Sequence, residues 1–296
     1  MAAEESLQFS DVIVEYASFV LTFLAVGAAG FRLNAGRAAG ATVTDDAERR
    51  WLTRAQDTAT TIGLVGAVGM AGIFTRSLLE RADEKHLAVA QFLQQNPPQM
   101  LTAALLVAIL VGALLARFRV GLGHVLASLV LVMPLRALAF GWKPERLVNP
   151  LHEYAAALWL GTLAVLVLAG VRPVLASGLP EVRRATLTKR MVDAFSPVAL
   201  GCVALLVTMG VITAWRHLGS LQALWSSPYG CALLVKLVVV AGVMALGAVN
   251  WRSRRVEAGT IEGARALQRS AELELWLSAV VLVVTAVLVN LPAPGE

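Results

Sequence analysis

Six side chains in this sequence are of types that could together bind a soft metal ion. They are three imidazoles and three thioethers, namely His86, His152, His217, Met100, Met133 and Met209. Imidazole and thioether groups are neutral, soft ligands that suit copper, above all Cu(I). All six fall in or beside the outer halves of apolar segments, so we expect them at one membrane level. For each methionine the alternative is packing, because methionine commonly fills apolar cores. For each histidine the alternative is a simple hydrogen bond, which is the usual role of a lone histidine at the end of a membrane span.

A second group of candidates consists of polar residues inside apolar segments: Lys236, Glu15, Arg136, Asn250 and Tyr229. A central Lys, Arg or Asp in a membrane helix costs about 2.5–3.5 kcal/mol on insertion scales, so such residues are functional candidates. The seven-residue spacing of Tyr229, Lys236, Val243 and Asn250 predicts a stripe that faces the bundle. Glu15 lies at a comparable depth, so a pair of Glu15 with Lys236 would neutralise both. The alternatives are a structural role, with an ion pair or a snorkelling lysine, and a role in ion passage.

The elements that must position these residues are membrane spans. The chain has 296 residues, of which 57% are hydrophobic and 15% charged, whereas soluble domains carry about 25% charged residues. Eight apolar segments are long enough to cross a bilayer as helices: about 12–30, 58–75, 100–117, 120–140, 152–171, 195–215, 229–250 and 272–291. We therefore expect an all-α, polytopic transmembrane helix bundle in which residues 1–296 form one unit.

The charges in the loops predict the topology. Eight spans place both termini on one side, and the loops on that side carry six Lys and Arg residues, against seventeen in the opposite loops. Positive residues favour the cytoplasmic side, so both termini should face away from the cytoplasm. Because the basic residues sit in short loops rather than on one amphipathic face, the lipid bilayer is the expected partner and nucleic acid is not.

Three further features complete the expected organisation. Residues 76–98 mix apolar and charged residues at helical spacing, which predicts an interfacial helix on the outer surface. The third and fourth spans are separated by a short turn, so they should form an antiparallel hairpin. The sequence contains no phosphate-binding loop, no zinc-protease helix and no nucleophile elbow, so we expect neither ATP-driven pumping nor hydrolysis, and no enzyme.

The second half contains four segments with a recognisable order of features. They are LHEYAAALWLGTLAVLVL at 151–168, AFSPVALGCVALLVTMGVITAW at 194–215, SPYGCALLVKLVVVAGVMALGAVNWR at 227–252 and ELELWLSAVVLVVTAVLVNLP at 272–292. Three features follow one another along these segments. The first segment begins with the pattern H-x6-W-x-G, the third contains Y-G-x5-K, and the fourth has an acidic residue before its apolar run. Over about residues 150–292 the chain resembles the integral-membrane copper resistance protein D (CopD-like) family, whereas the four spans of 1–140 match it only in hydropathy.

The resemblance implies a multi-pass protein of the bacterial cytoplasmic (inner) membrane that serves copper uptake or tolerance. Its family-like positions are His152, Trp159, Tyr229, Gly230, Lys236 and Asn250, of which His152 is the one able to bind a metal. We expect copper to pass from the outer side inward after delivery by a separate periplasmic copper chaperone. The alternatives are a non-enzymatic accessory subunit of a larger membrane complex and a haem-binding electron-transfer subunit. The haem-binding alternative is disfavoured because a membrane haem needs two histidines at one depth, whereas His124 and His152 are expected at opposite membrane faces.

Overall fold

The structure, a computed structural model, describes residues 9–218, 220 and 222–291. Every regular element in these residues is helical. Eight helical segments of the described chain are long and apolar enough to cross a membrane, judged by length and composition. This confirms the expected all-α bundle with eight spans, so the chain is a multi-pass membrane protein.

The first four spans contain seven of the helical elements, together with the short helix α4. Their bounds are α1 (Phe9–Phe31), η1 (Arg32–Gly36), α2 (Arg37–Gly40), α3 (Asp46–Glu84), α4 (Val89–Gln95), α5 (Pro97–Arg117), α6 (Gly121–Ala127) and η2 (Ser128–Leu138). The first span passes from α to π-helical backbone at η1 and back to α at α2. The fourth span continues from α6 into the 3₁₀ helix η2, which contains Pro134. Proline lacks the donor that an α-helix needs there, so it favours such a change in helix type.

Of the last four spans, the fifth and the seventh change between α and π-helical backbone, and the sixth and eighth are continuous α-helices. Their bounds are η3 (Pro144–Leu147), α7 (Val148–Ala156), η4 (Ala157–Gly161), α8 (Thr162–Val165), η5 (Leu166–Val171), α9 (Arg172–Leu175), α10 (Glu181–Leu218), α11 (Ala223–Ser226), α12 (Pro228–Val249), η6 (Asn250–Arg254), α13 (Arg255–Glu257) and α14 (Ile261–Val289). Within the fifth span, η4 and η5 are π-helical turns. Single π-helical turns occur frequently at functional sites.

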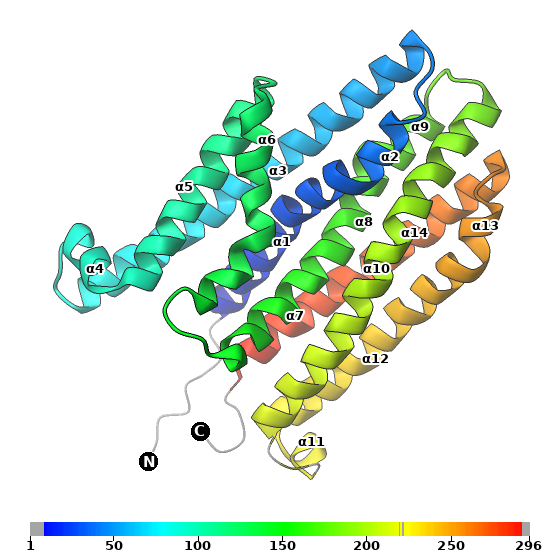
Figure 1. The fold of residues 1–296 in the computed structure, drawn as a ribbon. Helices are drawn as coiled ribbons and strands as arrows, with labels where there is room; N and C mark the ends of the chain where they lie inside the picture. The colour runs from blue at the N-terminus through cyan, green and yellow to red at the C-terminus, as the bar shows by residue number, and fades with distance from the viewer. Residues whose placement is uncertain (1–8, 219, 221, 292–296) are drawn as a thin grey trace.

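The helices run side by side and give the bundle two distinct ends (Figure 1). At one end lie the start of α1, the end of α14, α4, α7 and α11. We refer to this as the α7 end. At the other lie α2, the start of α3, α9 and α13, which we refer to as the α9 end.

The fifth span lies at the centre of the bundle. In its most apolar window 72% of the residues are buried, whereas the other seven spans reach 11–44%. The first span packs directly against it, because α1 contacts both η4 and α8. Gly27 of α1 and Gly161 of η4 meet at this crossing, and a Cβ added to either would collide with the backbone of the other helix. Small residues allow such close approach between membrane helices, so the two glycines bring the first and second halves of the chain into one core.

Three long helices begin at residues whose side chains accept a hydrogen bond from the first turn. Asp45 accepts from the Glu48 amide at the start of α3, Ser227 from Gly230 at the start of α12, and Thr260 from Gly263 at the start of α14. Such caps satisfy amides that have no partner within the helix, and each contributes about 1 kcal/mol. These three helices therefore begin at residues that the local sequence determines.

The region between the second and third spans differs from the prediction. No separate interfacial helix forms over 76–98, because α3 continues without a break to Glu84 and only the short α4 follows it. The helix ends where His86 adopts a left-handed backbone with φ 53°. The antiparallel hairpin is confirmed, since α5 packs along α6. Gly112 and Gly123 make this packing close, as neither has room for a Cβ.

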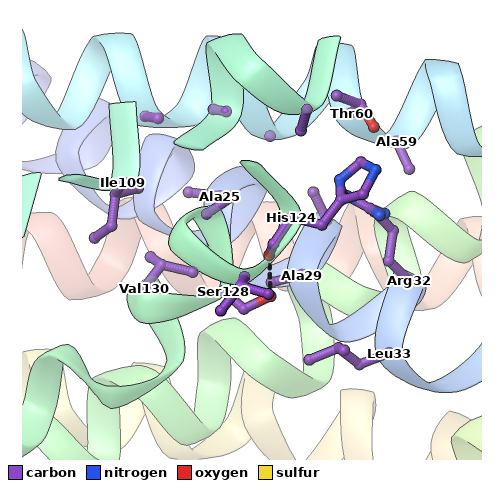
Figure 2. Close-up of a pocket in the computed structure, with 17 residues that line it drawn as sticks. Ala25, Ala29, Arg32, Leu33, Ala59, Thr60, Ile109, His124, Ser128 and Val130 are labelled. Atoms are coloured by element: carbon purple, nitrogen blue, oxygen red, sulfur yellow. Dashed lines mark hydrogen bonds between the residues drawn. The ribbon is translucent and has the colours of Figure 1, made fainter. Parts of the chain in front are cut away.

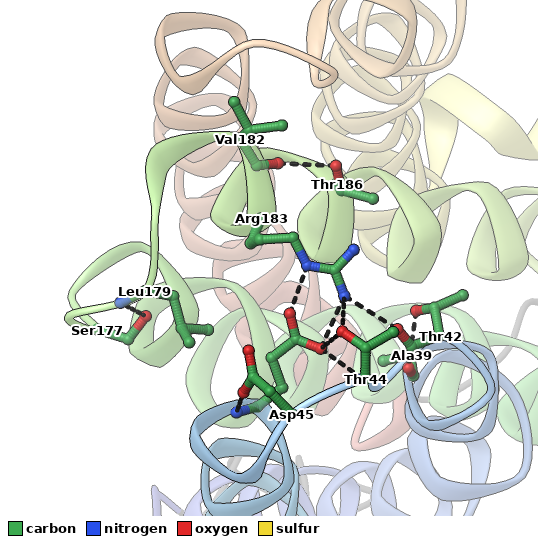
Figure 3. Close-up of polar contacts among 10 residues, drawn as sticks. Ala39, Thr42, Thr44, Asp45, Ser177, Leu179, Val182, Arg183 and Thr186 are labelled. Atoms are coloured by element: carbon green, nitrogen blue, oxygen red, sulfur yellow. Dashed lines mark hydrogen bonds and ion pairs between the residues drawn. The ribbon is translucent and has the colours of Figure 1, made fainter.

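An ion pair links α3 to α10 at the α9 end. Glu48 is fully buried, and the guanidinium of Arg183 binds both oxygens of its carboxylate. Arg183 also donates to the Thr42 carbonyl at 3.0 Å, and the Thr44 amide donates to Glu48 at 2.8 Å (Figure 3). The pair therefore holds the segment between α2 and α3 against the start of α10.

Candidate functional site

His152 lies in the second turn of α7, where this helix packs against α10. Its ring sits beside Gly210 of α10, and a Cβ added to Gly210 would lie 3.1 Å from Cε1 of His152. Thr213 supports the same contact by donating to Oδ1 of Asn149 at 3.1 Å. The Nδ1 atom of His152 is buried and makes no hydrogen bond of standard geometry within the residues described, while the backbone of Leu206 in α10 lies within hydrogen-bonding range of the ring. A buried, unpaired ring nitrogen is available to a ligand such as a metal ion.

Lys236 of α12 lies close enough to the His152 ring to act on it electrostatically. Its side chain is partly buried, and no acidic residue in the described chain forms an ion pair with it. Tyr229 and Val243, which lie seven residues before and seven residues after Lys236, are 7% and 3% exposed. The predicted stripe therefore lies on the buried side of α12, and it directs a positive charge toward His152.

The proposed pairing of Glu15 with Lys236 does not form. Glu15 of α1 instead lies within electrostatic range of Glu153 on α7, and Glu153 in turn lies within range of Arg136 in η2. Arg136 donates to the Met133 carbonyl at 2.9 Å. The α1–α7 contact thus holds two carboxyl groups and one guanidinium. This difference arises because the first span packs on the fifth span rather than on the seventh.

The other predicted metal ligands are dispersed. His86 is exposed in the turn between α3 and α4, on the flank of the bundle away from α7 (Figure 1), and Met100 is 50% exposed. Met133 is buried in η2 at 2% exposure, and Met209 is partly buried in α10, next to Gly210. The side chain of His217 lies outside the described residues.

Among the side chains that the structure describes, two of these candidates, His152 and Met209, lie on the adjoining helices α7 and α10. In the described chain no three His, Cys, Asp or Glu side chains gather closely enough to hold a metal ion. Met209 directly precedes Gly210 in α10, so it is the candidate methionine whose helix faces His152.

A second polar cluster lies where η6 meets α14, near the α9 end. Asn250 donates through Nδ2 to Glu274 at 2.8 Å, and the Glu274 side chain is 3% exposed. Both Glu274 and Trp159 of η4 approach Gly247, so this glycine provides the space in which they meet. Neither Glu274 nor Glu153 is among the site residues that the sequence suggests. For Glu274 the signal is the acidic stretch ELELW directly before the last apolar run, a feature of the CopD-like pattern, because an acid at the edge of a span is costly unless it has a partner.

His124 belongs to neither cluster. Its ring contacts the guanidinium of Arg32 in η1, and α6 places it toward the α9 end, whereas His152 lies at the α7 end. Two histidines that hold a haem must face each other at one depth. The arrangement therefore does not support a haem bound between His124 and His152.

Comparison with known proteins finds a similarity within the second half of the chain. Residues 189–288, which include Met209, Lys236, Asn250 and Glu274, match the family described as copper resistance protein D. This segment is CopD-like. The chain is also 31% identical over 150 residues to the copper transport protein CutJ of Bacillus subtilis (strain 168). That similarity covers 51% of this chain and 26% of the relative, so the chain spans about a quarter of the relative's length. No solved structure matches the chain.

The CopD-like segment supplies α12, most of α10 and nearly all of α14, and with them one wall of the candidate site. The other wall comes from residues that precede it. His152 and Glu153 lie in α7, and Glu15 lies in α1. The candidate site is therefore complete only where the CopD-like segment packs against α7 and α1.

Proposed function

We propose that this protein handles copper in the bacterial cytoplasmic membrane by passing copper ions from the α7 end of the bundle to the α9 end. The observation that carries the proposal is the buried, unpaired Nδ1 of His152 beside Gly210. This nitrogen adjoins a segment that matches copper resistance protein D, in a chain similar to a protein named as a copper transporter. Copper is the transported substrate in this proposal and not a resident cofactor.

Each group near His152 has a distinct role in this proposal. Glu15 and Glu153 place two carboxyl groups at the α7 end, where their oxygens can meet an entering cation, and Arg136 lies within range of Glu153. His152 and the thioether of Met209 form a soft, neutral ligand set suited to Cu(I). Lys236 opposes long residence of a cation at His152, and a transport site must bind weakly enough to release its ion.

The loop charges support the direction. The loops at the α7 end carry far fewer basic residues than those at the α9 end, which favours an α7 end on the outer side of the membrane. Copper would then arrive at the α7 end from a separate periplasmic chaperone. His86 and Met100 lie away from His152, so neither is needed for this path.

The test measures copper entry into liposomes that contain the purified protein and enclose a Cu(I)-sensitive dye. Wild-type protein should admit copper, His152→Ala should abolish entry, and His86→Ala should leave entry unchanged. Elemental analysis of the same preparations should find copper on the wild type and less on His152→Ala. Equal entry into liposomes of wild type and His152→Ala would overturn the role of His152. If the wild type neither binds nor admits copper but retains a stable partner on purification, the chain is an accessory subunit of a membrane complex and the copper proposal fails.

A further inference from the structure

A pocket opens between the first four spans, apart from the candidate copper site. Its volume is about 320 Å³, within the range of small-molecule sites. Its walls consist mostly of alanine and glycine from α1, α3 and α5, with α6 and η2 closing it. Figure 2 shows Arg32 and His124 at one end of the pocket, and Ile109 and Val130 at the other. The pocket therefore has a polar end and an apolar end.

Arg32 carries a positive charge that nothing in the described chain neutralises. Its guanidinium contacts the His124 ring, and no carboxylate forms an ion pair with it among the residues that the structure describes. The hydroxyl groups of Thr60 and Ser128, which also line the pocket, donate to backbone carbonyls four residues earlier in their own spans. The remaining N–H groups of Arg32 are thus the main donors that a ligand in the pocket would meet.

The edge of the pocket is apolar. Leu33 and Val125 both line it and are 53% and 65% exposed. In a membrane-spanning protein such exposed apolar residues face lipid chains, so the pocket is accessible from the bilayer. The backbone at Arg32 is π-helical, which places this side chain at an interruption of the first span.

We propose that this pocket binds an anionic amphiphile from the bilayer, with its acidic head group on Arg32 and His124 and its acyl chain among the small residues. An arginine fork matches the oxygens of a phosphate or carboxylate group, and basic pockets between membrane helices bind acidic lipid head groups. The ligand is a phospholipid or a free fatty acid, which share this chemistry. Neither the proposed copper path nor His152 takes part in this site.

Native mass spectrometry of the purified protein tests the proposal. The probes are phosphatidylglycerol, phosphatidylcholine with the same chains, and palmitate, each added at equal concentration. Wild-type protein should retain phosphatidylglycerol over phosphatidylcholine, and Arg32→Gln should lower that retention about tenfold, the effect of losing a charge-assisted hydrogen bond. Arg37→Gln is the matched control, because Arg37 is exposed in the adjoining α2 and does not line the pocket.

A second pair of variants tests the apolar end. Ala113→Leu narrows the pocket from α5, whereas Ala104→Leu adds the same volume to the exposed side of the same helix. Lipid retention should fall only for Ala113→Leu, with thermal unfolding showing that both variants are folded. Retention of palmitate that depends on Arg32 would support the site and identify a fatty acid as its ligand. If neither phosphatidylglycerol nor palmitate depends on Arg32 for its retention, the proposal is overturned.

Discussion

The ring of His152 packs against Gly210, and this contact joins the fifth span to the CopD-like segment. Glycine leaves room there for the ring, because a Cβ would lie 3.1 Å from Cε1 and 3.5 Å from Nδ1, and the imidazole would have to shift to relieve the closer contact. The position of the imidazole, and hence of its unpaired nitrogen, depends on the residue that faces it from α10.

Gly210→Ala should therefore displace the His152 ring and lower copper entry into liposomes by about fivefold to tenfold, since small misplacements of a reacting or binding group are costly. Gly201→Ala is the control, because Gly201 lies in the same helix with open space around it. Its copper entry should equal that of the wild type. An equal loss in both variants would mean that the effect comes from α10 in general and not from the contact with His152.

Replacing Lys236 should strengthen copper binding and slow its release. Lys236→Met removes a positive charge within electrostatic range of His152, and we expect roughly tenfold tighter binding together with slower entry. Lys236→Arg keeps the charge and should behave as the wild type. Copper affinity, measured by competition with a Cu(I) chelator, and entry rate are the two readouts. Unchanged affinity in Lys236→Met would show that the ammonium does not act on the site.

Loss of the buried carboxylate at position 48 should destabilise the fold. Glu48→Gln leaves Arg183 without its charged partner, and removal of one member of a buried pair costs about 3–5 kcal/mol. Because the Arg183 side chain is 30% exposed, we expect a smaller loss, about 2 kcal/mol, in the free energy of unfolding. The measurement is unfolding by denaturing detergent.

Glu181→Gln is the comparison for this variant. It breaks a pair with Arg184 in which the Glu181 side chain is 64% exposed, and exposed pairs contribute at most about 1 kcal/mol. Equal stability of the two variants would show that the Glu48 pair contributes no more than a surface contact.

The close crossing of α1 and η4 should tolerate no side chain. Gly27→Leu would place a branched chain against the backbone of Gly161, so we expect a large fall in the yield of monodisperse protein. Gly72→Leu, at a position of α3 with open space around it, should leave the yield unchanged. Size-exclusion chromatography in mild detergent measures both. A normal yield for Gly27→Leu would mean that the two helices can separate without loss of the fold.

The number of spans and the buried stripe of α12 could be predicted because both depend on local patterns. Apolar length sets the spans, and the seven-residue spacing around Lys236 sets the stripe. The proximity of Lys236 to His152 could not be predicted, because the neighbours of a helix depend on packing between distant segments. Glu15 meets Glu153 because α1 crosses the fifth span, and no spacing within α1 encodes that crossing.

Two further differences have physical causes. Charged residues at 76–84 suggest a separate interfacial helix, but nothing there interrupts helical hydrogen bonding, so α3 continues to Glu84. Glu153 carries no clear signal in the sequence, because it follows His152 and points to another face of the same helix. The fifth span is enclosed by neighbours on most sides, so that other face is also an interior surface.

The crossing of Gly27 over Gly161 also bears on the order of assembly during synthesis. The first span leaves the ribosome long before the fifth, so its glycine-containing surface stays exposed to lipid until η4 has been inserted. The second and fourth spans, which contact α1 through α3 and η2, are made in that interval and can shield its other sides. A chain that stopped before residue 161 would expose this narrow surface permanently, and quality-control proteases of the membrane would have a way to distinguish it from the finished protein.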